Sequence, residues 1–244
     1  MQKEYCYTNW NDIPWVESRE KVSRKEYLST HGLKISQVRL TPGHQPWMHA
    51  HEKEQVIFVL RGRCRVDVDG VSYPMKERCI LSVPSWAEHQ VVAEDEEAVV
   101  LSIFSPASEN APESRPAEIK PQSTRVFDFD AYQWECPRPK LRRKIYQGAD
   151  NFTMSLVEMD PNHEPAPHDH FYVQIVMCLD GRTVYHIDGE PLPLEAGTIL
   201  TTPPDAVHYS HNQNERTVTD FEIFWPKRDD REEPLPIAEG KADE

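Results

Sequence analysis

The chain has 244 residues, enough for one large domain or for two of roughly 100–150 residues each. Its formal net charge of −14 argues against a nucleic-acid partner, because phosphate binding needs concentrated Lys and Arg. No apolar run approaches the ~20 residues that cross a bilayer, so we expect neither a membrane partner nor a signal peptide. Five scattered cysteines without a CxxC pair favour reduced thiols in a cytoplasmic protein.

Short runs of Val, Ile, Thr and aromatic residues, separated by turn signals, predict an all-β chain. The 21 prolines, against only 9 glycines, suit short strands joined by rigid loops. Asp-Gly pairs at 69–70 and 188–189 predict two-residue hairpin turns. We expect, in chain order, an N-terminal arm over residues 1–20, a first barrel over 21–106, a linker over 107–124, a second barrel over 125–226 and a mobile charged tail over 227–244.

An internal repeat with an offset of 119 residues is the most informative pattern in the chain. The first copy contains Gly43, His49, His51, Gln55, Gly62, Pro84 and His89. The second copy contains, at unchanged spacing, Asn162, His168, His170, Gln174, Gly181, Pro203 and His208. Trp15 and Trp134 also match, and we expect each to pack on its own barrel. The repeat therefore predicts two tandem domains of the same fold.

The repeated histidines have the spacing of a metal site. Side chains alternate on a strand, so His49 and His51 share a face, and Gln55 returns to it. His89 must then arrive from a neighbouring strand. A lone histidine is more often a hydrogen-bonded core residue, but two copies of the whole set favour metal binding. The predicted ligands are His49, His51, Gln55 and His89, and His168, His170, Gln174 and His208.

These motifs resemble those of the cupin superfamily, and specifically of the two-domain bicupins. The cupin pattern runs from a Gly through His-x-His and an acidic residue to a second Gly, and closes with a Pro followed by a His. This chain departs from the pattern at Asn162, where the family has Gly, and at Gln55 and Gln174, where most members have Glu. The resemblance implies two tandem jelly-roll-like β-barrels, each enclosing one divalent ion, and a homodimer is one assembly it allows.

A glutamine ligand brings no charge, so it leaves the full charge of the cation in place and favours an anionic ligand such as a keto acid or an enolate. With glutamine at this position in both halves, the chain resembles the bicupin isomerases of bacilysin biosynthesis. These enzymes move double bonds in a prephenate-derived keto acid. We therefore expect a redox-neutral isomerase of secondary metabolism that acts on a small anionic substrate. An Fe(II)-dependent dioxygenase and a non-catalytic metal-binding or sugar-binding protein are the alternatives. Fe(II) is the first expectation for the metal, and Zn, Co, Ni, Cu and Mn are also compatible.

Residues for proton transfer are less well defined by the sequence. Glu158, and Glu222 within an apolar strand, are candidate general bases, although a solvent-facing role is an alternative for both. His44 and His163 recur beside the ligands and are candidate proton shuttles or solvated loop residues.

Two further positions concern the interior of the barrels. Trp47 should face inward, whereas its counterpart Ala166 is small, so the second pocket should admit the larger substrate. One of Tyr185 and His186 should also point inward.

Overall fold

The computed structural model describes residues 6–27, 32–105 and 124–237. Apart from one short 3₁₀ turn, η1 (Phe129–Ala131), the regular structure of these residues consists of β-strands, which confirms the all-β prediction. No helix in the described part of the chain is long and apolar enough to cross a membrane. The strands form two compact units, here called the first unit (residues 13–130) and the second unit (residues 1–12 and 131–244).

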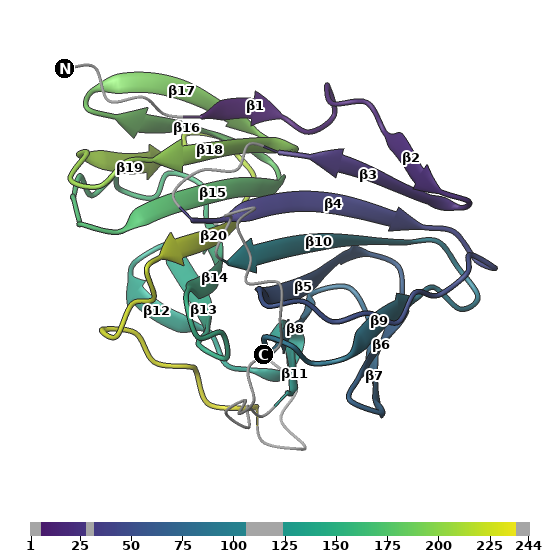
Figure 1. The fold of residues 1–244 in the computed structure, drawn as a ribbon. Helices are drawn as coiled ribbons and strands as arrows, with labels where there is room; N and C mark the ends of the chain where they lie inside the picture. The colour runs from purple at the N-terminus through teal and green to yellow at the C-terminus, as the bar shows by residue number, and fades with distance from the viewer. Residues whose placement is uncertain (1–5, 28–31, 106–123, 238–244) are drawn as a thin grey trace. The chain divides into compact units, whose positions relative to one another are not determined.

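The first unit contains a seven-stranded and a three-stranded sheet. Their strands are labelled in Figure 1. The larger sheet has the order β11-β8-β5-β10-β4-β3-β2 and the smaller has the order β7-β6-β9. Alternating apolar residues of both sheets, including Val59, Val66, Val83 and Val100, form one buried core. The strands are β2 (Val16–Arg19), β3 (Val22–Glu26), β4 (Lys34–Leu40), β5 (Glu54–Arg61), β6 (Cys64–Val68), β7 (Val71–Met75), β8 (Cys79–Val83), β9 (His89–Val92), β10 (Ala98–Ser105) and β11 (Val126–Asp128).

The second unit repeats this arrangement, as the internal repeat predicts. Its sheets have the orders β1-β18-β15-β20-β14-β13-β12 and β17-β16-β19. The strands are β1 (Tyr7–Asn9), β12 (Glu135–Arg138), β13 (Leu141–Tyr146), β14 (Thr153–Met159), β15 (Val173–Asp180), β16 (Arg182–Ile187), β17 (Glu190–Glu195), β18 (Thr198–Thr202), β19 (His208–His211) and β20 (Val218–Trp225). Each unit is an open, jelly-roll-like pair of sheets, and neither is a closed barrel.

The edge strands β1 and β11 are exchanged between the two copies of the repeat. Tyr7 of β1 pairs with Leu200 of the second unit, and Val126 of β11 pairs with Leu81 of the first unit. The units therefore differ from the expected division, in which residues 1–20 form an arm and the second barrel begins at 125. The physical reason is that β18 and β8 each have an unpaired edge, whose backbone groups the short strand satisfies.

The expected turns and termini have different outcomes. Both residues of the Asp69-Gly70 and Asp188-Gly189 turns have positive φ, as the type I′ hairpin requires. Residues 227–237 of the expected mobile tail are instead hydrogen-bonded to the second unit, with Ile237 N donating to Ala131 O at 2.8 Å. Of the expected linker, residues 107–123 lie outside the described residues, as do residues 238–244 of the tail.

Candidate metal centres

The first group of histidines forms where a loop meets the start of β9. His49 and His51 lie in the segment that leads into β5, Gln55 lies on β5, and His89 is the first residue of β9. His49 and His89 form an isolated antiparallel bridge, with reciprocal backbone hydrogen bonds of 3.0 and 2.8 Å. One ring nitrogen from each of the three histidines lies within 4.8 Å of the others. The three imidazoles therefore converge as the spacing predicts, although His49 and His51 precede the strand.

The second group repeats this geometry in the second unit. His168 and His208 form the equivalent bridge, with backbone hydrogen bonds of 3.2 and 2.8 Å. His168, His170 and His208 also bring one nitrogen each within 4.8 Å of the others. Asn162 replaces Gly43 in the preceding turn and adopts φ of 56°, against 76° for the glycine. Asparagine tolerates this left-handed conformation, so the departure at residue 162 preserves the turn.

Backbone carbonyls fix the tautomer of all six histidines. Each Nδ1 lies 2.7–3.0 Å from a carbonyl oxygen of a residue two positions away. A carbonyl only accepts, so each neutral ring carries its proton on Nδ1 and presents a bare lone pair at Nε2. Burial lowers the pKa of His89 and of His208 to about 4, which favours the same neutral form. Such an outer hydrogen bond is typical of metal-ligating histidines.

The glutamine oxygens complete each donor set. Gln55 Oε1 lies 3.2 Å from His51 Nε2 and 3.0 Å from His89 Nε2. Gln174 Oε1 lies 3.1 Å from His170 Nε2 and 3.0 Å from His208 Nε2. With the protons on Nδ1, these contacts join two acceptors, and lone pairs in such contact repel one another unless a cation lies among them. The residues therefore fit a divalent ion bound by three nitrogens and one neutral oxygen.

The group behind the glutamine differs between the two units. Gln55 Nε2 donates to Ser102 Oγ at 3.2 Å, whereas the Gln174 side chain lies near the carboxyl of Glu222 and acts to lower its pKa. Ser102 pairs with Ile57, and Glu222 pairs with the equivalent Val176, so the two residues occupy the same place in the fold. Burial raises the pKa of Glu222 to about 7, although nearby arginines oppose the shift. The side chain is only half-buried, because it borders a cavity.

Each set of ligands borders a cavity that also contains arginines. The cavity of the second unit has a volume of about 310 Å³, and that of the first unit about 270 Å³. Arg138 and Arg143 border the second cavity, and Arg19 and Arg24 the first, again with an offset of 119. These four residues were not among the predicted site residues; the repeat offset shows that they are equivalent but not that they face the cavities.

A family model described as a cupin domain matches residues 36–104 and again residues 155–224, together more than half of the chain. The chain belongs to the cupin family. Its two matched domains make it a bicupin, and the ligand candidates of each unit lie within one matched region, as the motifs predicted.

Solved bicupin-like structures share this fold. Oxalate decarboxylase from Bacillus subtilis is 16% identical and aligns with a TM-score of 0.73, over 90% of this chain and 76% of its own. AerE from Microcystis aeruginosa is also 16% identical and aligns with a TM-score of 0.70, over 87% of this chain and 96% of its own. A search of curated proteins found no match. At these identities the likeness establishes the fold of the bicupin and leaves its activity to its own residues.

The remaining acid–base candidates lie away from the two cavities. Glu158 accepts a hydrogen bond from Arg142 Nε at 2.7 Å. It is on the opposite face of β14 from Val157, which borders the cavity, so the structure does not bring Glu158 to the ligands. His44 and His163 are buried and accept backbone hydrogen bonds from Ala93 and Asn212, at 3.1 and 3.2 Å. They hold loops together and are not solvated, and neither borders the cavity beside either set of candidate ligands.

Trp47 differs from its expected place in the barrel interior. Its ring is 58% exposed and stacks on His49 at 4.3 Å, so it covers the mouth of the first cavity. Ala166 borders the second cavity, which is the larger of the two.

Of Tyr185 and His186, Tyr185 is the residue that points inward, because it is buried and its ring stacks on that of His208, with 6.0 Å between the ring centroids. A cavity of about 710 Å³ beside Gly181 and Asn214 is bordered by none of the candidate ligands or acid–base residues.

Proposed function

We propose that this bicupin is a metal-dependent isomerase that moves a proton, without net redox change, within a small keto acid. The observation that carries the proposal is the position of Glu222, whose carboxyl borders the same cavity as His168 and Gln174. A carboxyl beside a cation site is the group that proton removal from a substrate carbon requires. Both cupin motifs of this chain contain glutamine, and in this they resemble the motifs of the bicupin isomerases of bacilysin biosynthesis. This resemblance supports the same reaction class.

The residues of the second cavity divide the reaction among them. His168, His170, His208 and Gln174 would hold a divalent ion, which when bound acts as a Lewis acid that polarises a substrate carbonyl. Because the ligands are neutral, they leave the charge of the cation uncompensated. Glu222 accepts the proton from carbon and returns it at another carbon, while the arginines attract the acid group of the substrate.

The surroundings of the site agree with chemistry in a reducing compartment. All five cysteines are free thiols, and Cys64, Cys79 and Cys178 among them are buried. A cytoplasmic enzyme is therefore part of the proposal.

Oxygen dependence separates the isomerase from its nearest rival. Protein prepared without chelators is assayed with a prephenate-derived keto acid, and the shift of its double bonds is followed by NMR under air and under anaerobic conditions. We expect equal turnover in both atmospheres and about one bound ion per unit by elemental analysis. Turnover that requires stoichiometric oxygen uptake would contradict the isomerase and support the Fe(II) dioxygenase. A preparation supplied with transition ions that retains none would remove the basis of both.

A further inference from the structure

Two arginines at equivalent positions lie at the end of a bulged hairpin in each unit. Arg138 ends β12 and faces Leu141, and Arg19 ends β2 and faces Val22. In both hairpins the register shifts immediately before the arginine. A β-bulge redirects the side chain that follows it, and bulges are frequent beside active sites. Here the redirected guanidinium borders the cavity that also contains the histidine and glutamine ligands.

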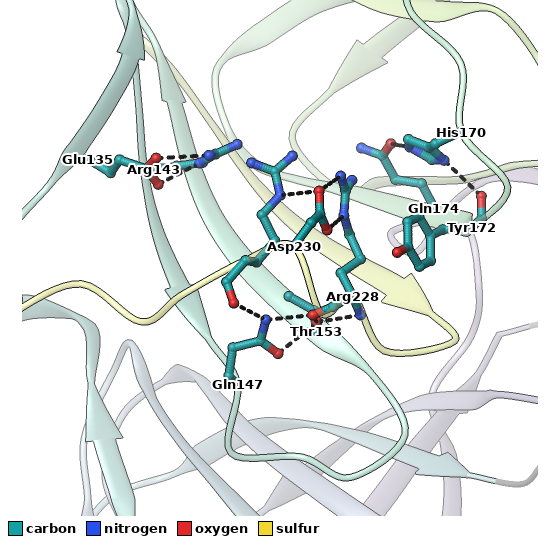
Figure 2. Close-up of polar contacts among 10 residues, drawn as sticks. Glu135, Arg143, Gln147, Thr153, His170, Tyr172, Gln174, Arg228 and Asp230 are labelled. Atoms are coloured by element: carbon teal, nitrogen blue, oxygen red, sulfur yellow. Dashed lines mark hydrogen bonds and ion pairs between the residues drawn. The ribbon is translucent and has the colours of Figure 1, made fainter.

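The neighbouring arginines of the second cavity already have carboxylate partners, as Figure 2 shows. Arg143 donates two hydrogen bonds to Glu135, at 2.8 and 2.9 Å. Arg228 is buried and donates two hydrogen bonds to Asp230, at 2.9 and 2.7 Å. Two nitrogens of each guanidinium group already donate to a carboxylate, so Arg143 and Arg228 have few donors left to bind a further anion.

Arg138, in contrast, has no hydrogen bond or ion pair to any described residue. Its side chain is half-buried, and burial lowers its pKa; the nearby charge of Glu222 opposes this shift, and that of Arg143 adds to it. Arg19 is likewise unpaired in the described part of the chain, and its only contact of this kind is with the Trp47 ring, 5.6 Å from the centroid. A guanidinium that is partly removed from water and makes no hydrogen bond or ion pair has unused donors, which an incoming anion would accept from.

The charges around Arg138 favour a carboxylate over a phosphate. Glu135, Glu222 and Asp230 are acidic groups near the arginines of this cavity, and their negative charge would repel a dianion more strongly than a monoanion. A carboxylate brings a single charge, and its two oxygens match the planar fork of one guanidinium. The volume of about 310 Å³ limits the ligand to a small molecule.

We propose that Arg138 holds the carboxylate of a small acid in the second cavity, and that Arg19 does the same in the first. The identification of this acid as a substrate rests on the proposed function, but its binding does not require turnover. Held in this way, the acid presents its remaining oxygen to the position at which the histidines and the glutamine would hold a cation. Arg19 and Arg138 are therefore residues that determine specificity.

Calorimetric titration of the full-length chain with 2-oxobutanoate tests the proposal. Each cavity is measured in a background in which the other arginine is already replaced, so the second cavity is studied in Arg19→Ala. There we expect Arg138→Ala and Arg138→Gln to weaken binding roughly 10–100-fold, and Arg138→Lys to weaken it less. The neutral analogue 2-oxobutanamide should bind weakly and equally to all four proteins. The matched control is Arg142→Ala, because Arg142 lies on the same hairpin but pairs with Glu158 on the other face, and it should leave the affinity unchanged.

Three results would overturn the proposal. The first is an affinity for 2-oxobutanoate that is the same in the Arg138 and Arg142 variants. The second is a loss of 2-oxobutanamide binding in the Arg138 variants as large as their loss of 2-oxobutanoate binding. The third is tighter binding of inorganic phosphate than of 2-oxobutanoate. Because binding is measured without catalysis, arginine-dependent binding in a protein that shifts no double bond would reject the isomerase and leave the carboxylate subsite in place. Arg19→Ala, measured in Arg138→Ala, applies the same test to the first cavity.

Discussion

The interiors of the two cupin units differ far more than their ligand sets. The first unit has Val59, Val66, Val83, Val100 and Ser102 at five interior positions. At the equivalent positions the second unit has Cys178, Tyr185, Thr202, Asp220 and Glu222. Strand pairing confirms the equivalence, because Val59 pairs with Val100 and Cys178 pairs with Asp220.

The first interior is that of an ordinary apolar core, which contributes stability by burying valines. The second is costly, because Asp220 is 1% exposed and neither of its carboxyl oxygens has a hydrogen-bond partner in the described structure. Polar groups of this kind are retained where they serve a function, because each one destabilises the fold. On the proposed function, we therefore expect proton transfer in the second unit, and we expect the first unit to provide stability and to bind without turnover.

The largest expected effect is the loss of one metal site or the other. His168→Ala should remove about one ion per chain and abolish turnover, because the cation site beside Glu222 is lost. His49→Ala should also remove about one ion but leave most of the turnover, because the first cavity has Ser102 in place of the carboxyl. Elemental analysis and steady-state rates of the two variants provide the measurement. Equal loss of turnover in both would reject the division of roles.

Replacement of Glu222 sharpens the same comparison. Glu222→Gln keeps the shape and the contact with Gln174 but removes the proton acceptor, so kcat should fall roughly 10²–10⁴-fold. The matched variant Ser102→Ala, at the equivalent position, should change kcat less than about twofold, because a serine hydroxyl does not take a proton from carbon. Metal content should remain the same in both. A Glu222→Gln enzyme with ordinary kcat would show that another group is the base.

The metal centres could be predicted from the sequence because most of their ligands lie close together in the chain and the whole set of ligands occurs twice. His49, His51 and Gln55 lie within seven residues, and His89 is found by the same offset that relates every ligand to its copy. Glu222 could be proposed because a charge within an apolar strand is conspicuous. The place of Glu158 could not be decided, because it depends on which face of β14 is turned toward the cavity.

Features that depend on long-range contacts could not be predicted. The exchange of β1 and β11 depends on hydrogen bonds between segments far apart in the chain, and strands as short as Tyr7–Asn9 carry no distinctive pattern. Arg19 and Arg138 were missed because the bulge that turns them toward the cavities is a feature of register, which their own sequence does not reveal. The burial of His44 likewise depends on the fold around it.

Asp220 provides a prediction of moderate size on stability and its pH dependence. Burial raises the pKa of Asp220 well above 3.8, and the nearby charge of Glu222 adds to this shift, while the thiol of Cys178 opposes it. As the pH rises above about 4, the unfolded chain ionises this group and the folded protein does not, so the folded state loses stability until the pH passes the folded pKa. Asp220→Val, which copies Val100, should remove this pH dependence and stabilise the protein by about 1–3 kcal/mol near neutral pH.

Denaturant unfolding of the wild type and the Asp220→Val variant at pH 5 and pH 8 checks this prediction. The stabilisation should be larger at pH 8, because more of the cost of keeping Asp220 protonated is removed there. The reverse substitution in the first unit, Val100→Asp, serves as the matched control and should destabilise it by a similar amount. If Asp220→Val were less stable at both values, the carboxyl would be a supporting group of the fold rather than a cost.

The smallest expected effect concerns the hydroxyl of Tyr185, which forms a buried hydrogen bond of 2.9 Å with Thr202 Oγ1. Tyr185→Phe should lower the free energy of unfolding by about 1 kcal/mol, because Thr202 loses its partner in the core. Thr202→Val should cost a similar amount, whereas the double variant, with both hydroxyls removed as at Val66 and Val83, should cost less than the two single changes added together. Such a double-mutant cycle gives a coupling free energy of about 0.5–1.5 kcal/mol if the hydrogen bond is the source of the effect. Strict additivity would mean that the two hydroxyls act independently, and the polar interior would then be a set of separate substitutions rather than one connected group.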